Sequence, residues 1–242
     1  MIVFDGDDQM RFFVGTSGYS YKEWKGIFYP DKLPQKEMLS YYSQHFSVVE
    51  MNNTFYRMPT ASMLKAWTTQ VPAGFRFVLK APQVITHFKR LKDVNEQTNH
   101  FLKTASVLSR QQGPLLFQLP PNFKKDLPRL ESFLNLIQDG TPVAMEFRHP
   151  SWFEEDVFAL LRAKSCALCF DDAEDIQSDE LVSTAHWGYL RLRRLRYSKK
   201  QLAEWLSQIK SRNWKEAYVF FKHEDTGTGP KLAARFIDLL NS

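Results

Sequence analysis

Short apolar runs recur along the chain, and each is followed by a polar loop and then by a longer amphipathic stretch. The runs begin roughly 20–40 residues apart, about the length of one strand-plus-helix unit. Short runs of this kind, bounded by turn residues, predict strands. The eight predicted strands are Phe12–Thr16, Val48–Asn52, Arg76–Lys80, Leu115–Gln118, Val143–Arg148, Ala167–Asp171, Tyr189–Arg193 and Ala217–Lys222.

The stretches between the strands have the spacing of amphipathic helices. Thr60 can cap a helix over Ala61–Gln70, and Asp93–Gln112 places apolar residues on one stripe before Gly113. Further helices are predicted after Asp126 and Ser198, and Gly229-Pro230 is expected to open the last one, because proline suits a first helical turn.

Eight alternating strands and helices predict an α/β fold, a single TIM-type (β/α)8 barrel over residues 1–242. The right-handed crossover rule makes the strands parallel, and no Gly/Ser-rich linker marks a domain boundary. A doubly wound open sheet is the alternative. It usually carries a GxGxxG phosphate turn after the first strand, and Val14-Gly-Thr-Ser-Gly18 does not match that pattern.

Charge and cysteine content limit the kinds of partner and the cellular location that fit the chain. The net charge of +5 permits an anionic partner without requiring one. Cys166 and Cys169 are the only cysteines, which excludes a disulfide framework, and on a strand they would face opposite sides as buried thiols. The first residues lack a basic signal-peptide region, and no run of 18 apolar residues occurs, so a cytoplasmic protein without membrane association is expected.

Polar residues end most of the predicted strands. Barrel enzymes place their chemistry at the carboxyl ends of the strands, so this repetition predicts a functional site there. An ion-pair network that only pins the strand ends is the alternative. The strand-end residues are Glu50, Asn52, Lys80, Gln118, Glu146, Arg148, Asp171, Arg191, Arg193 and Lys222.

Carboxylates and cations that lie close together shift one another's pKa values. Such shifts can give one carboxyl group the pKa of a general acid and another the pKa of a general base. The predicted acid–base pair is Glu50 and Glu146, with Asp171 orienting; Lys80 and Arg148 complete the catalytic set. Aromatic loop residues beside the mouth could stack on a base or sugar, or could simply pack the barrel end. The predicted substrate contacts in this region are Asn52, Tyr56, Gln118, His149 and Trp152.

A metal site is the next alternative. Glu50, Glu146, His149, Asp171 and His223 could supply ligands, but no HExxH motif or dense His/Asp cluster occurs, and nearby cations oppose a divalent ion. We therefore expect neither a metal nor a cofactor. His87 is expected to be a structural histidine.

An anion site is predicted after the last two strands. Arg191, Arg193 and Lys222 should lie near the turn Thr226-Gly227-Thr-Gly229, which opens the last helix. Backbone N–H groups at a helix N-terminus bind phosphate, and barrels often hold phosphate at this place. An ordinary glycine turn beside a solvated basic face is the alternative.

The motifs together resemble the YecE-like family, domain of unknown function 72. The resemblance covers nearly the whole chain, and it implies a TIM barrel but no activity. Near the C-terminus the chain departs from the commonest family pattern, with Tyr189-Leu-Arg-Leu-Arg-Arg194 and Phe220-Phe-Lys-His-Glu224. The shared motifs are Gly15-Thr-Ser-Gly-Tyr-Ser-Tyr21, Val49-Glu-Met-Asn-Asn-Thr-Phe-Tyr-Arg57, Phe77-Val-Leu-Lys-Ala-Pro82, Thr86-His87, Phe117-Gln-Leu-Pro-Pro121 and Glu146-Phe-Arg-His149 with Trp152.

Three functions fit these residues. The first is an acid–base hydrolase or lyase acting on a phosphate-bearing substrate, a small ligand, nucleotide or nucleic acid. The second is a non-catalytic nucleic-acid binder, and the third is a glycoside hydrolase, for which paired carboxylates are suitable. Surplus cations argue against a neutral sugar. The sequence indicates no oligomeric state.

Overall fold

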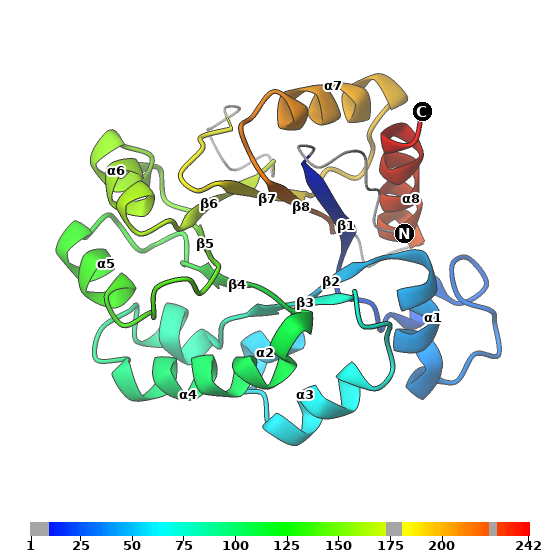
Figure 1. Cartoon of the computed structure of the whole chain (residues 1–242), viewed down its shortest axis with the longest axis horizontal. Helices are drawn as coiled ribbons and strands as arrows, with labels where there is room; N and C mark the ends of the chain where they lie inside the picture. The colour runs from blue at the N-terminus through cyan, green and yellow to red at the C-terminus, as the bar shows by residue number, and fades with distance from the viewer. Residues whose placement is uncertain (1–9, 173–180, 223–226) are drawn as a thin grey trace.

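The eight strands form one closed parallel barrel in the computed structural model, which describes residues 10–172, 181–222 and 227–242 (Figure 1). Each strand pairs with the next, and β1 pairs with β8, so the barrel closes. The prediction of a TIM-type barrel is confirmed, and the open sheet is wrong. The strands are β1 Arg11–Ser17, β2 Val48–Met51, β3 Arg76–Lys80, β4 Gln112–Gln118, β5 Val143–Glu146, β6 Ala167–Asp171, β7 Trp187–Leu192 and β8 Glu216–Phe221.

Helices surround the strands and cover the outer face of the barrel (Figure 1). The cap predicted at Thr60 is confirmed: its side chain accepts a hydrogen bond from the backbone of the following helix. Asp126 and Ser198, which precede two further predicted helices, do the same, and Ser198 forms a capping box with Gln201. The helices are α1 Met38–His45, α2 Asn53–Tyr56, α3 Ala61–Thr68, α4 Asn95–Ala105, α5 Leu127–Leu134, α6 Glu155–Ala163, α7 Lys199–Lys210 and α8 Thr228–Leu240.

Several predicted boundaries are wrong. The helix predicted over Asp93–Gln112 begins only at Asn95 and changes at Ser106 into a 3-10 segment that contains Ser109 at φ 50°. Gln112 already pairs with Phe77, because β4 begins there rather than at Leu115. Asn52, Arg148, Arg193 and Lys222 lie just beyond their strands, where the barrel stops pairing.

The hydrophobic core lies in two layers. Outward side chains pack against the helices, and inward ones fill the barrel, where Phe13 stacks on Tyr218 with ring centroids 4.7 Å apart. Cys166 belongs to the outer layer and Cys169 to the inner layer, both as buried free thiols, as predicted. Side chains along each strand alternate between the two layers. In most strands the last side chain that points into the barrel is polar, and these polar side chains together form the site.

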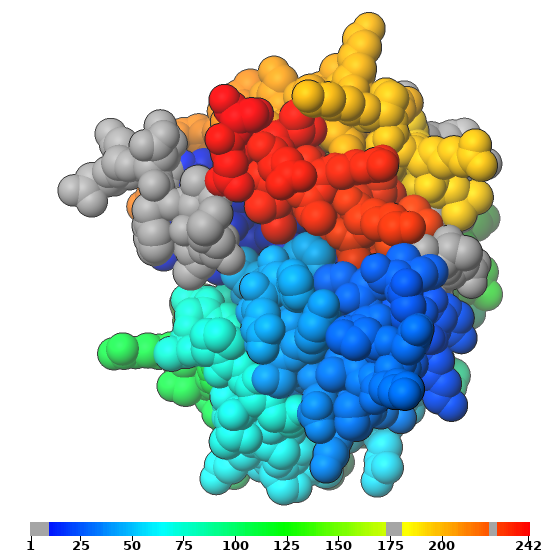
Figure 2. Space-filling view, turned by 90° about the vertical axis from the view of Figure 1, so that its right-hand side faces the viewer, coloured from blue at the N-terminus to red at the C-terminus, as the bar shows by residue number. Residues whose placement is uncertain are grey.

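The last helix, α8, packs beside β1. Figure 2 shows α8, drawn red, against the blue segments that follow β1. A pocket between them is lined by Phe28, Phe46, Pro230 and Ile237. The last helix thus closes the ring of helices where the barrel itself closes. Among the described residues, no helix is long and apolar enough to cross a membrane.

Candidate active site

A layer of polar side chains closes the carboxyl end of the barrel interior. Alternation along each strand points these residues inward, above the apolar filling that includes Val48, Leu116 and Tyr189. Such a layer is costly to bury unless its charges are paired. Its buried members are Ser17, Glu50, Lys80, Gln118, Glu146, Asp171 and Arg191.

Arg191 joins two carboxylates at the centre of this layer. Its Nη2 donates to Oε1 of Glu50 at 2.9 Å, and its Nη1 donates to Oε2 of Glu146 at 2.6 Å. Burial opposes the charge of Arg191, but Glu146 and Glu50 outweigh burial and hold its pKa well above the ordinary value. Tyr189 donates its hydroxyl to Oε2 of Glu50 at 2.6 Å, so both Glu50 oxygens are engaged.

Glu146 is held ionised. Gln118 donates its amide to Oε1, and the Nε of Arg148 donates to the same oxygen at 2.9 Å. Burial raises the pKa of Glu146, yet Arg191, Arg148 and Lys80 outweigh it and bring the pKa below the ordinary value. A carboxylate of this kind fixes its neighbours rather than exchanging protons near neutral pH. Glu50 is equally enclosed, and the acid–base roles of Glu50 and Glu146 stay a prediction.

Asp171 is the carboxyl group whose proton is poised for exchange. Burial first, and then the charge of Glu146, raises its pKa to about 6, against the opposing effect of Arg191 and Arg193. Arg193 donates Nη1 to Oδ2 of Asp171 at 2.9 Å, and Arg148 approaches the same oxygen at 3.5 Å. A pKa of this value suits proton transfer close to neutral pH.

Lys80 ends β3 beside these groups. Its Nζ lies 4.1 Å from the centroid of the Phe55 ring, a cation–π contact. Burial and the charge of Arg191 lower its pKa to about 8, with Glu146 and Glu50 opposing and Lys222 adding to the effect. Within the described residues, no carboxylate lies within ion-pair distance of Nζ.

His87 is a site residue that the sequence interpretation missed. It lies in the single turn Val84–Phe88 that follows β3, and its ring meets Phe55 edge-on at 4.8 Å. Burial, followed by the charges of Lys80 and Arg148, lowers its pKa to about 4, so the ring is neutral at pH 7. The short distance in sequence from Lys80 to His87 was the signal available. Phe55 is one of the loop aromatics expected beside the mouth, whereas the contact of Tyr189 with Glu50 was missed, since Tyr189 looks like an ordinary core aromatic.

A pocket of about 380 Å3 opens beside the mouth, at the ends of β1 and β2. Tyr19, Tyr21 and Asn53 contribute to its wall, together with Asn52. The Oδ1 atom of Asn52 is buried and has no hydrogen-bond partner among the described residues. The structure therefore places Asn52 in contact with the pocket, where its predicted role remains open.

Three predicted contact residues lie elsewhere. Trp152 is fully buried; its indole donates to the Phe123 carbonyl at 2.7 Å and its ring stacks on Phe147, so it packs a loop and is not available for stacking on a ligand. Tyr56 is 73% exposed. His149 accepts a hydrogen bond from the Ser151 backbone and caps the turn Pro150–Trp152.

The predicted anion site is only partly assembled. Arg191 cannot serve it, because two carboxylates inside the barrel enclose its guanidinium group. Gly227, at φ 61°, begins α8 and packs so closely on Ile27 that an added Cβ would lie 2.7 Å from Ile27, and Gly229 is buried in the first turn. Thr226 and His223 lie outside the described residues.

The mouth nevertheless keeps an excess of positive charge. Three carboxylates face five cations, and Arg148 and Arg193 keep 18% and 20% of their side-chain surfaces exposed. The five cations are Lys80, Arg148, Arg191, Arg193 and Lys222. In the part of the chain that the structure describes, no cluster of three or more His, Cys, Asp or Glu residues could hold a metal ion. The absence of a metal remains a prediction.

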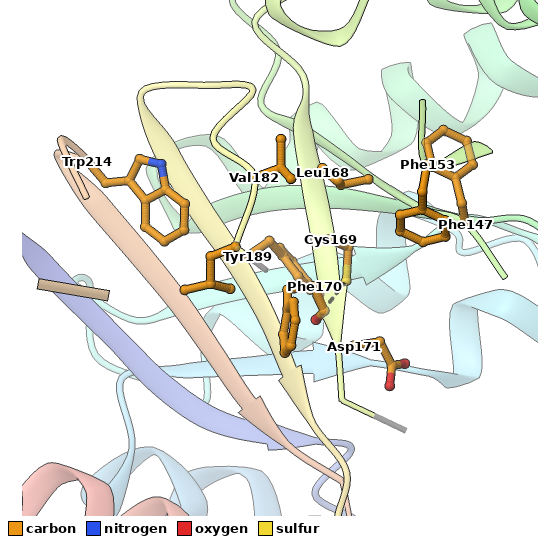
Figure 3. A pocket seen from close by; sticks show the side chains of 10 residues that line it. Phe147, Phe153, Leu168, Cys169, Phe170, Asp171, Val182, Tyr189 and Trp214 are labelled. Atoms are coloured by element: carbon orange, nitrogen blue, oxygen red, sulfur yellow. Dashed lines mark hydrogen bonds between the residues drawn. The ribbon is translucent and has the colours of Figure 1, made fainter. Parts of the chain in front are cut away.

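A second, narrower cavity lies beside β6. Phe147 and Phe153 line it on one side of the strand and Trp214 on the other, with Asp171 at the strand end (Figure 3). Its volume of about 20 Å3 accommodates a single water molecule. The charged mouth, rather than this cavity, is therefore the candidate active site.

Comparisons with known proteins agree with this fold. Residues 13–242 match the sequence model of a family described as protein of unknown function DUF72. The chain is 30% identical to the UPF0759 protein YecE of Escherichia coli over 142 residues, which are 58% of this chain and 50% of YecE. The matched region thus spans about half the length of YecE. It is 25% identical to the UPF0759 protein YunF of Bacillus subtilis over 223 residues, 87% of this chain and 78% of YunF.

Solved structures give the same result. A DUF72 family protein from Thermotoga maritima superposes with a TM-score of 0.83 at 27% identity, covering 97% of this chain and all of that one (100%). A DUF72 family protein from Enterococcus faecalis superposes with a TM-score of 0.77 at 19% identity, covering 97% of this chain and 99% of that one, and shows the fold alone.

Proposed function

The chain belongs to the DUF72 family of proteins of unknown function, and from its site we propose that it is an enzyme acting on a phosphate-bearing substrate by acid–base hydrolysis or lysis. One observation carries this proposal: the buried carboxyl group of Asp171, with a pKa of about 6, lies between Arg148 and Arg193, which reach a mouth with surplus positive charge. A proton-exchanging group beside anion-binding groups suits reactions at a phosphate-bearing centre.

The roles follow from the ion pairs. Arg191 ties Glu50 to Glu146 inside the barrel, and these three side chains hold the layer together. Arg148 and Arg193 reach the rim, where their remaining N–H groups can bind phosphate oxygens through charge-assisted hydrogen bonds. Asp171 then transfers the proton, as a base when ionised and as an acid when protonated.

The pocket at the ends of β1 and β2 supports a substrate larger than phosphate itself. Its volume of about 380 Å3 and its wall of Tyr19, Tyr21 and Asn52 suit a sugar or a nucleobase attached to the phosphate. A nucleotide would thus place its anionic part at Arg148 and Arg193 and its neutral part against the tyrosines.

Thermal unfolding tests the phosphate site. Millimolar phosphate or a nucleoside monophosphate should raise the melting temperature, because a ligand that binds only the folded state stabilises it by mass action. The double substitution Arg148→Gln with Arg193→Gln should abolish the shift. Arg196→Gln is the matched control, since Arg196 is an exposed arginine nearby, and it should leave the shift intact.

The alternatives give different results. A neutral oligosaccharide that stabilises the protein, with no effect of phosphate, would favour a glycoside hydrolase, although Glu50 and Glu146 are both tied to Arg191. A non-catalytic nucleic-acid binder is favoured by the exposed basic residues Arg194, Arg196 and Lys199 after β7. It would bind oligonucleotides with a steep salt dependence and without turnover.

A further inference from the structure

Lys80 is a cation of the mouth that forms no ion pair with any described residue. Arg148, Arg191 and Arg193 each pair with a carboxylate, whereas Nζ of Lys80 lies over the Phe55 ring and has no ion-pair partner among the described residues. A lysine that only balanced charge would be expected to contact one of the three carboxylates around it. Lys80 is also 9% exposed, so its amine is enclosed but open to the mouth.

The position of Lys80 is fixed by neighbouring elements. Thr54, which is fully buried, donates its hydroxyl to the Lys80 carbonyl at 2.7 Å and so ties α2 to the end of β3. Phe55, the next residue, is thereby held beneath the amine. The same ring contacts His87, with the two ring centroids 4.8 Å apart, so Lys80 and His87 both pack against Phe55.

Burial makes this amine reactive. At pH 7 an amine with a pKa of about 8 is neutral roughly 300 times more often than one at the ordinary lysine value of 10.5, and only the neutral form is a nucleophile. His87, with its pKa near 4, is available to accept a proton at the same pH. The charged and titratable groups acting on these two side chains are Arg191, Glu146, Glu50, Lys222, Arg148 and Arg90.

We propose that Lys80 is a nucleophile that forms an imine with the carbonyl group of an aldehyde or ketone that also carries phosphate. The phosphate part of this inference rests on the proposed function.

The reaction balances without another reactant. The neutral amine of Lys80 adds to the carbonyl carbon, the carbonyl electron pair moves to oxygen, and His87 transfers a proton from the nitrogen to that oxygen. A second proton, taken from solvent, lets the hydroxyl group leave as water, and a protonated imine remains. The imine withdraws electrons from the adjacent carbon, whose proton an ionised Asp171 can accept. Addition of water to the imine returns the carbonyl compound and the free lysine.

Reductive trapping tests this inference. The intact protein is incubated with glycolaldehyde phosphate, reduced with sodium borohydride and analysed by peptide mass mapping. Lys80 should be modified at least about 10-fold faster than surface lysines, because its amine is neutral more often. The rate should rise with pH up to about 8 and then level off. Modification confined to surface lysines, with Lys80 unmodified, would overturn the proposal.

Substitutions refine the result. Lys80→Arg keeps the positive charge and should lose trapping while retaining the melting shift with phosphate. Lys199→Arg, at an exposed lysine of α7, is the matched control and should trap like the unmodified protein. His87→Asn should slow trapping by about 100-fold, the lower end of general acid–base effects. An unchanged rate would remove His87 from the reaction.

The two proposals fail in different ways. Glycolaldehyde, which lacks phosphate, should still modify Lys80 if the imine inference is correct, but more slowly than its phosphate ester. Equal rates with the two aldehydes, together with no melting shift, would contradict the phosphate site and leave the imine. A melting shift with phosphate but no trapping at Lys80 would contradict the imine and leave the phosphate site.

Discussion

At the scale of single residues, the properties of the site depend on which charged side chains form ion pairs with one another. Arg191 donates to one oxygen of Glu50 and to one oxygen of Glu146, so it ties these two carboxylates together inside the barrel. Asp171 is left with an unfavourable balance, because burial and Glu146 disfavour its charge more than the arginines favour it. Side chains of one chemical type thus take opposite roles through burial and neighbours alone.

Asp171→Asn should reveal the cost of this balance. Because the folded state raises the pKa of Asp171 from 3.8 to about 6, the folded protein binds the proton more tightly than the unfolded chain. This group therefore favours folding below pH 4, and that contribution is lost as pH rises to 6. The free energy of unfolding of Asp171→Asn, relative to that of the unmodified protein, should therefore rise by up to about 3 kcal/mol between pH 4 and pH 6. Above pH 6 this difference should stay constant.

Urea unfolding at several pH values measures that difference. Asp126→Asn, at the cap of α5, is a useful comparison, since Asp126 lies at the surface and pairs with Arg129 there. A gain for Asp171→Asn that was independent of pH between 4 and 6 would show that the carboxyl group titrates normally in the folded protein.

At the scale of elements, α2 is short but positions two site residues. It has only four residues, so its own helical hydrogen bonds cannot hold it, and Thr54 supplies the missing anchor at the carbonyl of Lys80. The helix in turn presents Phe55 to Lys80 and His87. A buried hydroxyl thus connects a local element to the geometry of the mouth.

Thr54→Val should destabilise the protein by about 1–2 kcal/mol, because the Lys80 carbonyl loses its buried donor. Thr98→Val is a matched control: Thr98 is equally buried, but its hydroxyl has no hydrogen-bond partner. That change should be neutral or stabilising, since it removes an unsatisfied polar group. Chemical denaturation of both variants decides the matter, and equal losses would argue against the anchoring role of Thr54.

At the scale of the whole molecule, the barrel is one cooperative structure closed by β1 and β8. Gly15 is in register with Val48 of β2, and an added Cβ would lie 2.2 Å from the Val48 carbonyl oxygen. No side-chain rotation can relieve a contact with backbone, so β1 and β2 would have to separate. A disturbance at this position therefore acts on the closure of the whole sheet.

Gly15→Ala should lower the stability of the entire barrel by about 1–3 kcal/mol. Because the strands form one closed sheet, circular dichroism and tryptophan fluorescence should report the same shifted transition. Two separated transitions would show that part of the barrel unfolds on its own.

The agreement between sequence and structure is closest where the signal is local. The period-two alternation in Val48–Met51 and Ala167–Asp171 identified strands and their inward faces, and the caps at Thr60 and Ser198 marked helix starts. The helix predicted over Asp93–Gln112 was too long, because apolar spacing continues through the 3-10 segment and does not report the backbone change at Ser109.

The sequence by itself determined the barrel, the face on which each strand-end residue lies, and the collection of those residues at one rim. Periodicity is a property of neighbouring residues, so it specifies faces and ends. Only the tertiary structure decided the partners: Arg191 and Glu50 are 141 positions apart, and their contact depends on how the closed barrel brings β7 and β2 across its interior. The same closure left Lys80 without a carboxylate and enclosed Trp152, because pairing and burial depend on distances between strands that no local pattern encodes.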